Sequence, residues 1–198
     1  MSKQIIVAIC REYGSMGHYI AQEIANRLQI KLYDKEILIQ KAEEDGFDKD
    51  MFEYYDEKKR NFFFSRTVNG FSNSIEDIIA EKTFDFQRKL AESGESFVVV
   101  GRCCDQVFKD NPNAIRIFVC GQYEAKVKHL MEAFNLTRKE AELKIVKHDK
   151  NRKMYHNLYC DTKWGDSRAY DLTVNSSKLG IDKTVDLVYD LIKIYFDL

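Results

Sequence analysis

Three short and almost uninterrupted apolar runs constrain the fold of this chain most strongly. They occupy residues 5–10, 96–100 and 115–120, with the letters IIVAIC, SFVVV and IRIFVC. A strand with one face in water alternates apolar and polar residues, whereas a strand covered on both faces is apolar throughout. The runs therefore predict buried strands of a parallel sheet. Residues 170–174 and 31–33 are weaker candidates for two further strands.

Stretches with helical spacing separate these runs. Apolar residues recur every three or four positions within 20–28, 75–90, 127–134 and 185–195. Thr137 and Glu140 form a capping-box pattern, which predicts the start of another helix. The alternation of strands and helices predicts an α/β fold in three layers, with a mainly parallel sheet flanked by helices.

Composition limits the classes of function. The 198 residues are 44% apolar, and 31 basic against 32 acidic residues give a net charge of −1. No overall positive field attracts nucleic acid or an anionic membrane, and no apolar run reaches the roughly 18 residues of a membrane span. Five cysteines without CxxC spacing favour free thiols in a reducing compartment. We therefore expect a cytoplasmic single-domain protein without nucleic-acid or membrane partners.

The loop after the first expected strand has the layout of a phosphate-binding turn. Residues 11–19 read REYGSMGHY and lead into a helical pattern. Glycines let backbone N–H groups approach phosphate, and a helix N-terminus adds positive partial charge. Against the pattern GxxxxGK[ST], only the second glycine is matched. An ordinary tight turn is the alternative. The candidate binding residues are Gly14, Ser15, Met16, Gly17, His18 and Tyr19.

Charged residues also follow two other expected strands, at the edge where parallel sheets place ligands. Arg102 follows the run 96–100, and a guanidinium there can bind phosphate through two hydrogen bonds. A surface salt bridge to Asp105 is the alternative. Asp34 follows the run 31–33 and is suited to binding a sugar or base, to capping a helix, or to both.

A basic segment, KHDKNRK at 147–153, precedes several aromatic residues. On a helix, Asp149 and Arg152 share a face with His148 and His156. Such a run is usually a solvated face, but the basic and aromatic mixture suits a lid that brings positive charge to a transferred phosphoryl group. No zinc site is expected, because the histidines show no ligand-like pairing with cysteines.

Together these motifs resemble the cytidylate kinase-like proteins of bacteria, a branch of the P-loop nucleoside monophosphate (NMP) kinases. The matching stretches are spread over most of the chain. They are CREYGSMG at 10–17, YDKEIL at 33–38, VVVGRC at 98–103, DKNR at 149–152, WGD at 164–166 and YDLTVNSSKLG at 170–180. Each is weak alone, but their order and spacing are specific.

The resemblance implies a P-loop nucleotide-kinase-like fold with ATP and Mg²⁺ as cofactors. The loop at 11–19 would hold the ATP phosphates. Arg102, Asp34 and Asp105 would bind the acceptor, and Arg152, with Lys150 or Lys153, would neutralise charge on the transferred phosphoryl group. The implied core comprises about 1–33, 96–148 and 169–198, with a helical NMP-binding insert at about 34–95 and a lid at about 149–168.

Two departures from the family pattern leave alternatives open. Many members carry glycine at position 16 and arginine or lysine at position 18, where this chain has Met16 and His18. The first interpretation is a kinase for CMP or a related acceptor. The second is a non-catalytic nucleotide- or phosphate-binding module, and the third is a kinase for a non-nucleotide small molecule or an interaction protein. Eight aromatic residues at 47–71 favour a packed helical insert or a homodimer face over a base-binding site.

Overall fold

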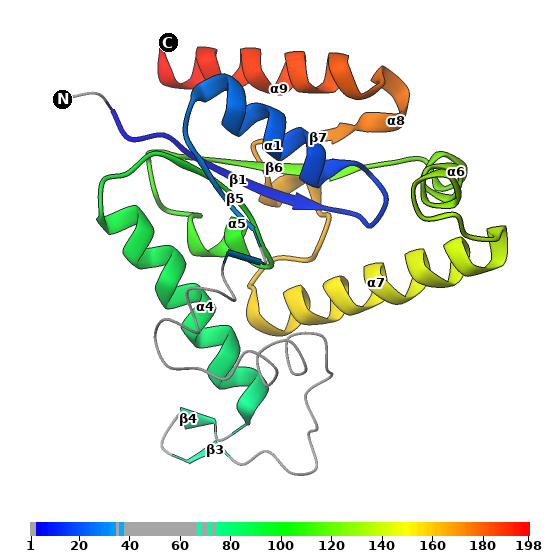
Figure 1. Cartoon of the computed structure of the whole chain (residues 1–198). Coiled ribbons are helices and arrows are strands. Elements are labelled where there is room, and N and C mark those ends of the chain that lie inside the picture. The colour runs from blue at the N-terminus through cyan, green and yellow to red at the C-terminus, as the bar shows by residue number, and fades with distance from the viewer. Residues whose placement is uncertain (1–2, 35, 38–66, 69–70, 73) are drawn as a thin grey trace.

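A five-stranded parallel sheet forms the centre of the protein (Figure 1). The computed structural model describes residues 3–34, 36–37, 67–68, 71–72 and 74–198. The strand order is β2-β5-β1-β6-β7. The strands are β1 (Ile6–Arg11), β2 (Lys31–Tyr33), β5 (Phe97–Val100), β6 (Ala114–Cys120) and β7 (Leu172–Asn175). The five strands expected from the sequence are thus confirmed, with ends that shift by one or two residues.

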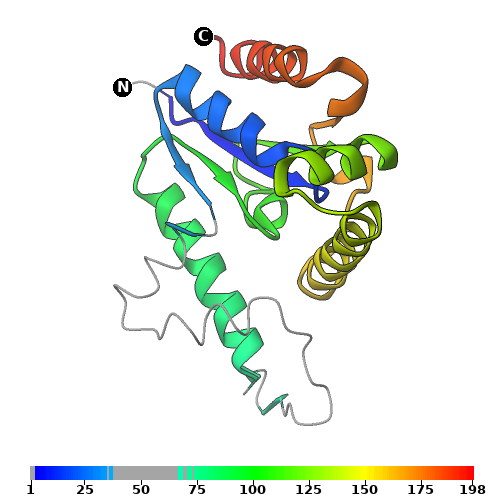
Figure 2. The same cartoon turned by 45° about the vertical axis from the view of Figure 1, so that its right-hand side comes forward.

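Helices cover both faces of this sheet, so the expected three-layer α/β architecture is confirmed (Figures 1 and 2). Helices α1 and α9 lie on one face, and α4 and α5 lie on the other. Helices α6 and α7 pack against each other at one end. Their bounds are α1 (Gly17–Leu28), α4 (Ile75–Glu92), α5 (Cys104–Val107), α6 (Tyr123–Phe134), α7 (Arg138–Tyr159), α8 (Ser176–Leu179) and α9 (Ile181–Phe196).

The central strand β1 is apolar throughout because its side chains alternate between two cores. Val7 and Ile9 belong to the core under α1 and α9. Ile6 and Ala8 belong to the core on the α5 side. All four side chains are fully buried. This double burial explains why the sequence shows a continuous apolar run rather than an alternating one.

Helix α7 begins as the sequence predicts and runs further than the expected lid boundary. Thr137 and Glu140 form the reciprocal capping box, and Leu136 packs beside Ala141. The helix then continues unbroken for 22 residues to Tyr159. Residue 149, where the expected lid starts, therefore lies within this helix, and the lid stays a prediction.

The segment expected as an NMP-binding insert is described only in part. It contributes α4 and a two-stranded antiparallel sheet of β3 (Thr67–Val68) and β4 (Phe71–Ser72). Most of the aromatic stretch at 47–71, including Phe62–Phe64, lies outside the described residues. None of the helices that are described is both long and apolar enough to cross a membrane.

Candidate functional site

The loop between β1 and α1 makes a tight turn against the carboxyl end of β1. Gly14 and Met16 both adopt left-handed backbone, with φ values of 79° and 63°. At Gly17 an added Cβ would lie 2.5 Å from the Cβ of Arg11. Only glycine therefore fits at position 17, and its absent side chain lets α1 start directly beside the last residue of β1.

The expected loop ligands have unequal roles. Ser15 is buried, and its hydroxyl lies 2.9 Å from the carbonyl oxygen of Glu12 and 3.1 Å from that of Val119, so it holds the turn together. His18 and Tyr19 stand exposed on the first turn of α1, with His18 Nε2 3.7 Å from Asp34 Oδ2.

The carboxylate of Asp34 acts as a cap in the described structure. Asp34 Oδ1 accepts hydrogen bonds from the backbone N–H groups of Glu36 and Ile37, each at 3.1 Å. The helix-capping role that the sequence allowed is therefore present. The second carboxylate oxygen of Asp34 faces His18. Binding of the acceptor by Asp34 stays a prediction.

An ion network from α6 and α7 clamps the loop. Tyr13 donates its backbone N–H to Asp149 Oδ1 at 2.6 Å. Lys126 Nζ lies 2.9 Å from Glu12 Oε2 and 3.0 Å from Asp149 Oδ2, and its side chain is only 6% exposed. Burial alone would lower the pKa of Lys126, but hydrogen bonds to the two carboxylates raise it above its ordinary value. Lys126 has no place in any sequence motif, so its role could not be predicted.

One face of α7 meets this loop, as its sequence pattern predicts. The His148 ring stacks on Tyr13, with ring centroids 4.2 Å apart. Arg152 lies over the same tyrosine and donates from Nη1 to the carbonyl oxygen of Arg11 at 3.1 Å. Lys150, an expected catalytic residue, is exposed on α7, outside the pocket described next.

A small, strongly cationic pocket lies at the carboxyl ends of β1 and β5. Four of the side chains that line it carry or can carry positive charge, and no carboxylate lines it among the described residues. Its lining is Cys10, Arg11, Gly101, Arg102, Cys103, Arg152, His156 and Trp164.

Crowding of positive charge marks this pocket as a place for an anion. Burial, together with repulsion from Arg11 and Arg102, lowers the pKa of Arg152 to about 9. Arg102 is held with its guanidinium carbon 4.8 Å from the centre of the Tyr155 ring. Guanidinium groups bind phosphate and carboxylate groups through paired hydrogen bonds. The structure thus brings Arg102 and Arg152 together as expected, and adds Arg11, which sequence reasoning did not single out.

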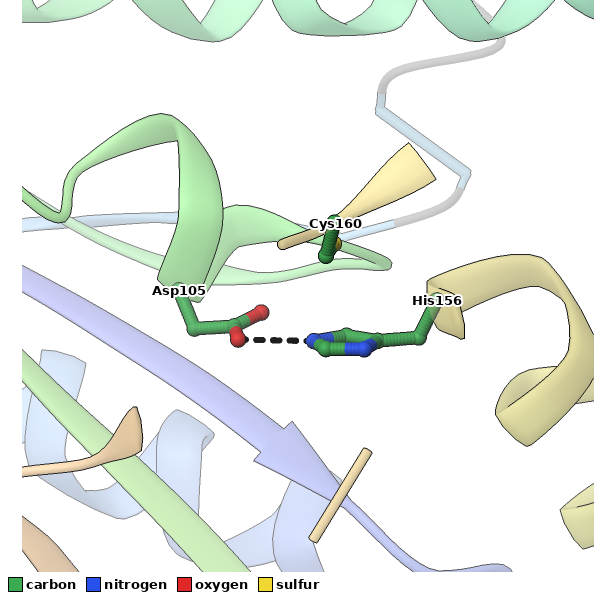
Figure 3. Close-up of side chains that lie close together, drawn as sticks. All are labelled: Asp105, His156 and Cys160. Carbon is green, nitrogen blue, oxygen red and sulfur yellow. Dashed lines mark hydrogen bonds and ion pairs between the residues drawn. The ribbon is translucent and has the colours of Figure 1, made fainter. Parts of the chain in front are cut away.

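Behind the pocket lies a cluster of Asp105, His156 and Cys160 (Figure 3). Asp105 Oδ2 is 2.8 Å from His156 Nε2, and both side chains are 2% exposed. Burial alone would lower the pKa of His156, but the hydrogen bond to Asp105 and the neighbouring thiol of Cys160 raise it to about 10. Asp105, expected to bind the acceptor, is hydrogen-bonded to this histidine, and acceptor binding by Asp105 stays a prediction.

The cluster corrects one expectation from the sequence. No histidine was expected to pair with a cysteine, yet one potential ligand atom from each of Asp105, His156 and Cys160 lies within 4.8 Å of the others. His156 and Cys160 are four residues apart at the end of α7. That spacing was a usable signal, because positions four apart share one helix face. Asp105 is distant in sequence from His156 and Cys160, so no spacing signal indicated that it joins them.

The charges of the lining residues favour an oxyanion at the arginine pocket over the loop, although the pocket in this state has room for only about one water molecule. The loop offers backbone groups of 14–18 to phosphate, but Asp149 already accepts from the N–H of Tyr13. ATP phosphates would compete with that carboxylate. The hydroxyl of Ser15, a potential Mg²⁺ ligand, is bound to backbone carbonyls.

Comparisons with solved structures agree with this fold. An uncharacterized protein from Eubacterium ventriosum ATCC 27560 is 37% identical, with 96% of this chain and 99% of that chain covered and a TM-score of 0.77. The shikimate kinase from Bacteroides thetaiotaomicron is 12% identical, covers 96% of this chain and 98% of its own, and has a TM-score of 0.57. Shikimate kinase from Acinetobacter baumannii in complex with shikimate is 9% identical, with 96% of this chain and 94% of that chain covered and a TM-score of 0.55.

These two kinases show that the chain has the P-loop kinase fold. No protein in the curated set matches the chain. The sequence profile of the cytidylate kinase-like family matches residues 6–178, which include the loop after β1, the arginine pocket and α7. The chain therefore belongs to the cytidylate kinase-like family.

Proposed function

We propose that the protein is an ATP-dependent kinase that transfers a phosphoryl group to CMP or a related small anionic acceptor. The observation that carries this proposal is the convergence of Arg11, Arg102 and Arg152 on one pocket at the carboxyl edge of the sheet. Ligands of parallel α/β folds bind at this edge. The family and the kinase fold support the same class of reaction.

In this proposal the protein acts by positioning and charge stabilisation. The phosphate of a nucleotide acceptor is already a nucleophile, so no general base is required. Arg102 binds the acceptor, and Arg152 and Arg11 neutralise negative charge that develops during transfer. The backbone of residues 14–18 and His18 would hold ATP with Mg²⁺, which supplies further neutralisation of the phosphate charge.

The second candidate is a binding module that does not turn over. The observation that favours it is the clamp on the loop: Asp149 accepts from the Tyr13 N–H, and Lys126 is held between two carboxylates. His18 stands where the motif has lysine. A loop in this state binds ATP weakly unless α7 releases it, so ATP affinity and turnover separate the two candidates.

The test is an ATP–Mg²⁺ phosphorylation assay with CMP, dCMP, UMP, AMP, GMP and shikimate as acceptors. Arg152→Ala is measured beside the wild type to expose contaminating kinase. Lys147→Ala, which removes an exposed lysine of the same helix, is the matched control. Turnover of one acceptor that is lost only in Arg152→Ala supports the kinase. Absence of turnover over the whole panel, with ATP or an acceptor still bound, supports the binding module.

A further inference from the structure

The ring of His156 has one nitrogen with a partner and one without. Nε2 is bonded to Asp105. Nδ1 is buried and has no hydrogen-bond partner among the described residues. His156 also lines the arginine pocket. A buried polar group without a partner costs free energy, so such a group points to a ligand that supplies the missing bond.

The surroundings of His156 decide what that ligand offers. The carboxylate of Asp105, itself buried, lies against Nε2 and favours the imidazolium form. An imidazolium has a donor on both nitrogens, so Nδ1 requires an acceptor. The other cationic groups of the pocket are guanidiniums, which only donate. Every cationic group that lines the pocket is therefore a hydrogen-bond donor and requires an acceptor.

We propose that His156 is a fourth ligand of the anion in this pocket, with Nδ1–H donating to an oxygen of a phosphate group, and that Asp105 is the positioning residue for it. This inference rests on the proposed function for the identity of the anion as the acceptor phosphate. The proposal gives the pair of Asp105 and His156 a joint role in anion binding. Neither the motifs at the strand ends nor the basic run of α7 indicates such a joint role. Asp105 fixes the orientation of the ring through Nε2 and balances its charge.

A divalent metal such as Zn²⁺ is the competing occupant of the same cluster. Asp105, His156 and Cys160 are suitable ligand types and lie close together. Two observations favour the anion. Three guanidinium groups line the adjoining pocket and repel a cation. A metal bound to Nε2 between Asp105 and Cys160 would leave Nδ1–H to be donated to a carboxylate or carbonyl, and Nδ1 has no such partner among the described residues.

The direct test is NMR of the full chain labelled with ¹⁵N-histidine during titration with inorganic phosphate. The proposal expects His156 to be doubly protonated before titration, and its Nδ1–H signal to shift and saturate with phosphate. His129 of α6 is the internal control and should not move. A neutral His156, a signal that ignores phosphate, or no phosphate binding at all would overturn the proposal. Because this experiment needs neither ATP nor turnover, it fails or succeeds independently of the kinase assay.

Variants then separate the anion from the metal. His156→Gln should weaken phosphate binding by about tenfold or more, because a hydrogen bond to a charged group is lost. His129→Gln should leave the affinity unchanged. Asp105→Asn should weaken it too, with the His156 signals showing a neutral or reoriented ring. Cys160→Ser should leave phosphate affinity intact. Stoichiometric Zn²⁺ binding that is lost in Cys160→Ser and His156→Gln, without an effect of phosphate on His156, would establish the metal site instead.

Discussion

Asp149 of α7 accepts a hydrogen bond from the backbone N–H of Tyr13, with 2.6 Å between the nitrogen and Oδ1. A carboxylate thus occupies a donor of the loop that a phosphate would otherwise use. The same carboxylate shares the buried ammonium of Lys126 with Glu12. Helix α7 and the loop are therefore joined by a charged contact, and ATP bound at the loop as proposed would compete with it.

We expect Asp149→Asn to bind ATP–Mg²⁺ more tightly than the wild type, because a negative charge next to the phosphates is removed. The unfolding free energy should fall by about 1–2 kcal/mol, since Lys126 loses one of its charged partners. Isothermal titration and urea unfolding measure the two effects. Glu142→Gln, on the same helix and paired with Arg138, should change neither by a comparable amount. Equal or weaker ATP binding in Asp149→Asn would contradict the displacement.

Arg152→Met should remove anion binding without lowering stability. Burial and the guanidiniums of Arg11 and Arg102 disfavour the charge of Arg152, so losing that charge relieves repulsion in the folded state. We expect an equal or higher Tm without phosphate. Added phosphate should raise the Tm of the wild type and not that of the variant. A large drop in Tm would show that Arg152 is mainly structural.

Gly17→Ala should destabilise the protein by about 1–3 kcal/mol, the cost of overpacking a tight contact. The added Cβ would lie 2.5 Å from Arg11 Cβ, so the variant should also displace that arginine and weaken phosphate binding. Gly101→Ala is the comparison for stability, because position 101 does not have left-handed backbone and an added Cβ there would lie no closer than 3.4 Å to a neighbouring atom. Chemical unfolding that ranks the two variants equally would argue against a steric cause.

The stability of the wild type should fall between about pH 6.5 and 10 through His156. Its ordinary pKa is 6.5, and the hydrogen bond to Asp105 together with the neighbouring thiol of Cys160 outweighs burial and raises the pKa to about 10 in the folded protein. A group whose pKa is raised by folding contributes its full stabilisation of the folded state at pH values below its pKa in the unfolded chain. This contribution is lost as the pH rises through its pKa in the folded protein. His156→Gln should lack this slope in urea unfolding. Parallel pH profiles of the two proteins would refute the charged pair.

Cys160 should be alkylated faster than Cys120 at pH 7. A hydrogen bond from Cys103 and the nearby His156 outweigh burial and lower the pKa of Cys160 to about 7, whereas burial raises that of Cys120. Thiolate is the reactive form. Mass spectrometry after brief iodoacetamide treatment measures both sites. His156→Gln should slow the reaction at Cys160 only, and equal rates in the wild type would exclude an activated thiol.

The sheet was predictable because each strand carries its own signal. The run 5–10 is apolar at every position, and a strand buried on both faces requires that. The face of α7 was also predictable, since Asp149, Arg152 and His156 follow helical spacing. In contrast, the pairing of Asp105 with His156 joins residues 51 positions apart. No local pattern encodes such a contact.

The same limit explains the other omissions at the site. Arg11 ends a strand and looks like the start of a loop, so its place in the pocket depends on how α1 approaches it at Gly17. Lys126 lies on an ordinary amphipathic helix, and only the packing of α6 beside the loop gives it two carboxylate partners. Lys150 is exposed and does not line the pocket, so its catalytic role stays a prediction, because a basic run does not say which lysines face inward. Tertiary contacts, rather than spacing, decide these roles.

The unbroken course of α7 has a mechanical consequence. Twenty-two residues of helix span about 33 Å. Three of the residues described above, Asp149, Arg152 and His156, lie on this one helix. If α7 tilted about its connection to α6, Asp149 would release the Tyr13 N–H. The same movement would withdraw the positive charges of Arg152 and His156 from the pocket. If the loop and the pocket hold the two substrates as proposed, one movement of this helix would open both binding places at the same time.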